Sequence, residues 1–119
     1  MANPRLAPGP GDDGLVDGAS GLVWEARPSD APMPWSEAAA SDWRLPSIDE
    51  LMSVLVDLPP AHPCTPPPGR VLWSASASPF ASASQVRVVG CAPGPSYRVM
   101  LRDRLNVAWA WRVRRSGPR

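Results

Sequence analysis

The stretch Asp42-Trp43-Arg44-Leu45-Pro46-Ser47-Ile48-Asp49-Glu50-Leu51 predicts a sharp turn that leads into a helix. Pro46 disfavours the helical conformation for the residue before it, and Ser47 is a favourable N-cap. Glu50 stands three residues later, where its side chain would complete a capping box with Ser47. The apolar residues that follow recur on one side of the helix, as packing on a core requires; they are Ile48, Leu51, Met52 and Leu55.

Short elements are predicted on both sides of this helix. Upstream, alternation around a glycine-flanked turn predicts strands at residues 15–17 and 22–25, and a short helix is expected over 35–40. Downstream, two prolines end the helix by residue 57. Strands are then expected at 71–76, 85–89, 97–101 and 109–114. The fold class predicted from this order is α+β, with a short two-helix region flanking a small, mainly antiparallel sheet with long loops.

The length of 119 residues corresponds to one domain. Residues 1–13 are rich in Pro, Gly and Asp and are expected to form a flexible lead-in, followed by the domain at 14–115 and a tail at 116–119. The 17 prolines favour short elements and long loops. The first ten residues lack the apolar core of a signal peptide, and no apolar run reaches membrane-spanning length. We therefore expect no membrane insertion, and a cytoplasmic chain unless it is part of a longer exported protein.

Charge is distributed unevenly along the chain. Residues 1–57 hold every acidic residue except Asp103, whereas residues 58–119 hold every Arg except Arg5, Arg27 and Arg44. The two halves could complement each other within one fold, or the basic half could bind an anionic partner. In the second case the candidate ligand-binding residues are Arg98, Arg102, Arg104, Trp109, Arg112 and Arg114, with Arg87 as a further member of the basic surface. The pI of about 7.8 and the lack of a recognised motif argue against nucleic acid as that partner.

No pattern in the sequence indicates an enzyme or a cofactor. His62 is the one histidine and has no evident partner, and a Ser-rich stretch at 74–84 lacks a motif that would supply a base. One His and two Cys are too few for a structural zinc site, so no metal is expected. Cys64 and Cys91 would allow either one disulfide in an oxidising compartment or two free thiols.

Several stretches of the chain occur in an order that resembles the Lcl C-terminal domain family. These are Gly21-Leu22-Val23-Trp24, Trp35-Ser36-Glu37-Ala38-Ala39, the stretch quoted first, Leu72-Trp73-Ser74-Ala75-Ser76 and Trp111-Arg112-Val113-Arg114. The resemblance covers residues 14–115 and implies a C-type-lectin-like fold, distantly related to formylglycine-generating-enzyme domains. The residues expected to hold this scaffold are Trp24, Trp43, Arg44, Pro46, Ser47, Glu50 and Trp73.

The resemblance also implies a function. We expect a non-enzymatic binding module that recognises a protein or a glycan, whether neutral or anionic, through a loop face at residues 76–84, 90–96 and 102–108. The chain contains neither the Glu-Pro-Asn nor the Trp-Asn-Asp calcium signature of sugar-binding C-type lectins, so recognition is expected to be independent of calcium. The alternatives are an intracellular protein–protein recognition or scaffold domain and a hypervariable ligand-binding protein of the retroelement-diversified type. The ligand and the oligomeric state are left open.

Overall fold

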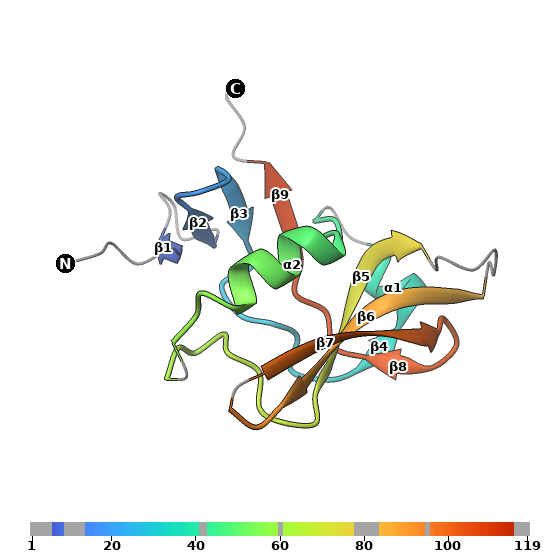
Figure 1. Cartoon of the computed structure of the whole chain (residues 1–119). Coiled ribbons are helices and arrows are strands. Elements are labelled where there is room, and N and C mark those ends of the chain that lie inside the picture. Colours follow the sequence, from blue (N-terminus) through green and yellow to red (C-terminus); the bar gives the residue numbers. More distant parts are fainter. Residues whose placement is uncertain are drawn as a thin grey trace.

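The computed structural model describes residues 6–8, 14–40, 43–59, 61–77, 84–94 and 96–115. These residues form a small, compact α+β domain in which antiparallel sheets dominate (Figure 1). The α+β class expected from the sequence is therefore confirmed. No described helix has the length and apolar character needed to cross a membrane.

A three-stranded sheet forms the centre of the domain. It contains β5 (Val71–Ala77), β6 (Gln85–Ala92) and β7 (Ser96–Asp103), in the order β5-β6-β7 with antiparallel pairing. The register between β6 and β7 is unbroken from the Gln85–Asp103 pair to the Ala92–Ser96 pair. Apolar side chains alternate between the two faces of this sheet, so both faces can be covered.

Each face of the sheet belongs to a different core. Leu72 and Val89 point into the α2 core, which lies between the sheet, the helix α2 (Ile48–Leu55) and the terminal strands. Trp73 and Val88 point into the α1 core, which contains Ala38 of the short helix α1 (Trp35–Ala39). Figure 1 shows α2 above the central sheet and beside the terminal strands. The chain thus buries apolar side chains on both sides of β6.

The two ends of the domain meet in one four-stranded sheet. Its strands are β1 (Leu6–Pro8), β2 (Leu15–Asp17), β3 (Leu22–Trp24) and β9 (Val113–Arg115), in the order β1-β2-β3-β9. Leu6 pairs with Asp17, and Leu22 pairs with Arg115 across the other edge of the hairpin. Because residues 18–21 form the turn between β2 and β3, the start of β1 and the end of β9 lie at the same end of this sheet.

A third, two-stranded sheet joins β4 (Met33–Pro34) to β8 (Val107–Ala108). The segment after β8 continues along the edge of the central sheet: the N–H of Trp109 donates to Val71 O, and the N–H of Trp73 donates to Trp109 O, both at 2.9 Å. This segment then reaches β9 through Trp111, whose ring is fully buried against Trp24 with ring centroids 4.5 Å apart.

The structure differs from the sequence prediction at several places, including the unpredicted strands β4 and β8. Leu6–Pro8, inside the expected flexible lead-in, pair with β2 as strand β1. The strand expected at 109–114 is limited to Val113–Arg115, because residues 109–112 bond in turn to β5 and to loop residues instead of one partner strand. The loop expected at 90–96 begins only after Ala92, since β6 continues to that residue.

Candidate functional site

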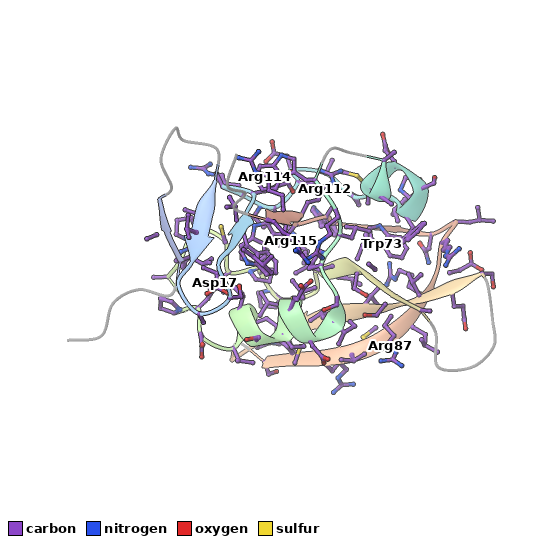
Figure 2. The ribbon with its side chains drawn as sticks, turned by 90° about the horizontal axis from the view of Figure 1, so that it is seen from above. Asp17, Trp73, Arg87, Arg112, Arg114 and Arg115 are labelled. Atoms are coloured by element: carbon purple, nitrogen blue, oxygen red, sulfur yellow. The ribbon has the colours of Figure 1, made fainter. Side chains whose placement is uncertain are left out.

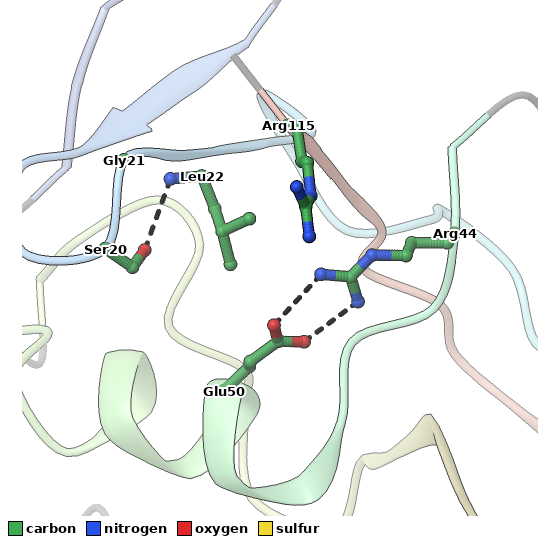
Figure 3. A pocket seen from close by; sticks show the side chains of 6 residues that line it. All are labelled: Ser20, Gly21, Leu22, Arg44, Glu50 and Arg115. Atoms are coloured by element: carbon green, nitrogen blue, oxygen red, sulfur yellow. Dashed lines mark hydrogen bonds and ion pairs between the residues drawn. The ribbon is translucent and has the colours of Figure 1, made fainter. Parts of the chain in front are cut away.

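An open pocket of about 420 Å³ lies between the terminal sheet and the start of α2. It is lined by Ser20, Gly21, Leu22, Arg44, Glu50 and Arg115. Figure 3 shows the side chain of Arg115 extending toward the Arg44–Glu50 ion pair, with Ser20, Gly21 and Leu22 of the β2–β3 turn on one side. The lining carries two guanidinium groups and one carboxylate, which leaves one excess positive charge.

The turn that forms one wall is fixed by Asp17. Its buried carboxylate accepts hydrogen bonds from the Ala19 N–H at 3.0 Å and the Ser20 hydroxyl at 2.7 Å. Gly21 has a φ of +79°, a conformation that side chains other than glycine rarely adopt, and its N–H donates to Asp17 O at 2.8 Å. The turn therefore holds the Ser20 hydroxyl and Leu22 at the pocket rim.

The floor of the pocket is the start of α2. Ser47 Oγ accepts from the Glu50 N–H at 3.1 Å, and Glu50 Oε1 accepts from the Ser47 N–H at 2.8 Å, so the predicted capping box is present. The same carboxylate accepts two hydrogen bonds from Arg44, from Nη1 to Oε1 and from Nη2 to Oε2, both at 2.9 Å. The hydrogen bond from Arg44 is the main cause that lowers the pKa of Glu50 below its ordinary value.

Arg44 is held beside β9 by its backbone. Its N–H donates to Val113 O at 2.9 Å, and its C=O accepts from the Val113 N–H at 2.8 Å. Since Val113 and Arg115 belong to the same strand, this pairing places Arg115 next to the Arg44–Glu50 ion pair. Among the residues that the structure describes, none forms a hydrogen bond or ion pair with the Arg115 side chain. The pocket can therefore accept one anionic group, with Arg115 as the available charged donor.

Most of the predicted ligand-binding residues are engaged elsewhere. Arg112 makes an ion pair with Glu25 at 3.2 Å, and its Nε donates to Ala38 O at 2.7 Å, so it holds the interior together. Arg114 stacks on the Trp43 ring at 4.6 Å. Figure 2 shows Arg112, Arg114 and Arg115 around β9, while Arg87 lies on the far side of the molecule.

The other four predicted residues are distributed over the central sheet and its loops. Arg102 Nη1 donates to Val107 O at 2.8 Å, and the Arg104 guanidinium lies 4.5 Å from the centre of the Trp35 ring. Trp109 is half-buried, and its ring is covered by Arg70 at 4.6 Å. Arg98 is exposed on β7. The structure therefore does not gather the six predicted residues into one surface.

The predicted loop face is also divided. Ser84, the last residue of the predicted stretch 76–84, meets the stretch 102–108 at one end of the central sheet, where the Arg104 N–H donates to Ser84 O at 2.8 Å. The turn within 90–96 lies at the other end, because β6 and β7 are paired along their whole length. Residues 78–83 and 95, like Asp42 of the first quoted stretch, lie outside the described part of the chain.

The residues expected to hold the scaffold are buried, or they connect one element to another. Trp24 and Trp73 are fully buried, one in each core. Pro46 is buried, and its C=O accepts from the Ala75 N–H at 2.8 Å, which ties the helix start to β5. Trp43 is half-buried beneath Arg114. Arg44 and Glu50 fix the start of α2 and also line the pocket.

The two cysteines are buried free thiols. Cys64 Sγ donates to Ala26 O at 3.2 Å, and burial raises the pKa of each thiol to about 11. The disulfide that the sequence left open is therefore absent, and both thiols stay protonated at neutral pH. No group of three or more His, Cys, Asp or Glu side chains in the described ranges could hold a metal ion.

Comparison with protein-family models, with curated proteins and with solved structures gives no match. The candidate site accordingly stands on its own geometry. Arg115 was missed by the sequence prediction because nothing in its neighbourhood distinguishes it from Arg112 and Arg114. Strand alternation put Arg112 and Arg114 together, but only the pairing of β9 with β3 shows that Arg115 faces the Ser20–Leu22 turn.

Proposed function

We propose that this chain is a non-enzymatic, calcium-independent binding module of C-type-lectin-like architecture, and that it receives an acidic group of a protein or glycan in the Arg44–Glu50–Arg115 pocket. The observation that carries the proposal is the side chain of Arg115, which points into an open pocket and has no partner among the described residues. The architecture is supported by the order of the sequence motifs and by the pairing of the terminal strands in one sheet.

The chemistry of the lining favours a single carboxylate or sulfate. Glu50 neutralises the charge of Arg44 through a bidentate ion pair. The net attraction for an anionic ligand therefore comes from Arg115. A guanidinium presents parallel N–H donors that match a carboxylate or sulfate group. At the rim, Leu22 adds an apolar surface, and Ser20 adds a hydroxyl oxygen that can still accept one hydrogen bond, because its proton is donated to Asp17. This suits the apolar and hydroxyl-bearing sides of an acidic sugar.

The first test is binding to an array of uronic-acid-bearing and sulfated glycans, with a protein pull-down in parallel. Arg115→Ala should weaken binding by about tenfold or more, the usual effect of losing a charged donor. The matched control is Arg87→Ala, since Arg87 lies on a different sheet and outside the pocket. Equal binding by wild type and Arg115→Ala, or no binding of any acidic probe by the folded protein, would contradict the proposal.

A second variant should shift affinity in the opposite direction. Glu50→Gln keeps a residue that can complete the capping box but removes the negative charge that neutralises Arg44. The pocket would then present two uncompensated guanidinium groups, and binding of the acidic probe should become tighter. A loss of binding in folded Glu50→Gln would show that the ligand needs the Arg44–Glu50 pair intact.

A further inference from the structure

The two edge strands of the central sheet, β5 and β7, differ in their backbone hydrogen bonds to other segments. Along β5, the backbone bonds to other segments: Val71 and Trp73 to Trp109, and Ala75 to Pro46. Along β7, residues 96–102 make no backbone hydrogen bond to any described residue outside the β6–β7 pairing. Figure 1 shows β7 at the outer side of the sheet. The alternate residues of β7 thus direct outward N–H and C=O groups that pair with no residue of the described ranges.

The two faces of β7 carry different side chains. On the face shared with the α1 core, the strand carries Arg98 and Arg102, which lie about 13 Å apart along the strand, with the half-buried Met100 between them. Arg98 is exposed and has no side-chain partner among the described residues, and Arg102 uses one nitrogen on Val107 O. On the other face lie Val99, which is 46% exposed, and Leu101.

From this arrangement we infer that β7 is a docking edge for an extended peptide segment that alternates acidic and apolar residues. The segment would add as a further strand, and its backbone would satisfy the outward N–H and C=O groups of β7. Because side chains alternate along a strand, its acidic residues would lie beside Arg98 and Arg102, while its apolar residues would cover Val99 and Leu101. This edge is separate from the pocket at Arg115, so either proposal can fail without the other.

The charges on β7 select this occupant over a second copy of the chain. Two β7 strands related by a two-fold axis would place Arg98 and Arg102 of both copies on one face of a joint sheet. Like charges across from each other destabilise such a pairing. An acidic strand instead gains the attraction of both guanidinium groups.

The test uses a short labelled peptide of alternating Glu and Val, with its ends blocked, and follows fluorescence anisotropy in about 0.15 M NaCl, where exposed charges are screened as in cells. The wild-type domain should bind it. The charge-reversed double variant Arg98→Glu, Arg102→Glu should lose about tenfold or more of this affinity and should gain affinity for the matching peptide of Lys and Val. Arg87→Glu should bind as wild type, because Arg87 lies on the central strand β6.

A second peptide separates strand addition from charge attraction alone. Methylation of alternate backbone nitrogens of the Glu–Val peptide leaves its charge unchanged but removes the donors needed for pairing, so binding should be lost. Equal binding of the methylated peptide would overturn the inference, as would the absence of binding to the unmodified peptide. Sedimentation of the domain without peptide measures its oligomeric state. A wild-type dimer whose stability changes in the double variant Arg98→Glu, Arg102→Glu would overturn the inference and assign the β7 edge to a second copy of the chain.

Discussion

The guanidinium of Arg112 joins segments that are far apart in the sequence. It contacts the Glu25 carboxylate after β3, the Ala38 carbonyl of α1 and, at 3.5 Å, the sulfur of Met33. Its backbone N–H also donates to Glu25 Oε1 at 2.8 Å. Arg112 is only 15% exposed, so these contacts are made in a setting where an unpaired charge is costly.

Removal of this side chain should destabilise the fold. Arg112→Ala leaves the Glu25 carboxylate and the Ala38 carbonyl without their side-chain donors, and we expect a loss of about 2–4 kcal/mol in the free energy of unfolding. Urea denaturation monitored by tryptophan fluorescence measures it. Arg27→Ala is the matched control, because Arg27 is exposed in a loop and should change stability by less than about 0.5 kcal/mol. Similar values for the two variants would contradict the structural role of Arg112.

The partners of individual Arg and Trp side chains could not be predicted from the sequence. Alternation correctly separated the buried Trp111 and Val113 from the more exposed Arg112 and Arg114. It could not distinguish a guanidinium that faces solvent from one that meets Glu25 or Trp43, since these partners come from distant segments. The same holds for the half-buried tryptophans at 35, 43 and 109, each of which has an Arg from elsewhere over its ring.

Among the elements, α2 follows most directly from its sequence. Its N-cap and capping box agree with the local pattern, because capping depends on residues three positions apart. Its buried side agrees except that Val54 is buried where Met52 was expected. The segment at 109–112 is the opposite case. Its alternation is that of a strand, yet Ala110 bonds to Ser29 and Arg112 to Glu25, so no single strand accompanies it. Periodicity alone cannot tell a strand from an extended segment with mixed partners.

The start of α2 should make stability depend on pH. The pKa of Glu50 is lowered, chiefly by the hydrogen bond from Arg44, so the stability that Glu50 contributes is fully present above its ordinary pKa of 4.5 and is lost as the pH falls through the lowered value. The free energy of unfolding of wild type should therefore exceed that of Glu50→Gln most at neutral pH. Urea titrations between neutral and acidic pH measure this difference, and a difference that stays constant would contradict the prediction.

At the scale of the molecule, one strand supports both cores. Val88 and Val89 are neighbours on β6, but Val88 packs in the α1 core and Val89 in the α2 core. Leu72 and Trp73 repeat this division on β5. The central sheet therefore contributes side chains to both cores. Because loss of the sheet would disrupt both, we expect the α1 core and the α2 core to unfold in one transition.

This arrangement predicts similar and nearly additive effects from two adjacent substitutions. Val88→Ala and Val89→Ala each remove two buried methyl groups, so each should cost about 1.5–3 kcal/mol in the free energy of unfolding. Because the two side chains contact different residues, the double variant should lose the sum to within about 0.5 kcal/mol. Urea unfolding followed by tryptophan fluorescence and by circular dichroism should give one shared transition. Separate transitions would show that the cores unfold independently.

The sequence predicted the α+β class and most of the strands of the central sheet, because those strands are long enough to show their alternation. It did not predict that the strands sort into three sheets, since β1, β4 and β8 are too short to carry a pattern and are defined by their partners. The candidate pocket depends on the same distant pairings: Arg44 meets Val113, and Leu22 meets Arg115. Its residues therefore could not be brought together from local patterns.

The position of Leu6 and Arg115 at one end of the terminal sheet has a mechanical consequence. A pull applied through these two positions would act across the strands, at the edges β1 and β9, instead of along them. The backbone hydrogen bonds would then be loaded one pair after another, as when a zipper is opened, and not all at once as in shearing. A domain tethered through these positions should therefore yield at a lower force than one pulled along the length of β6 and β7.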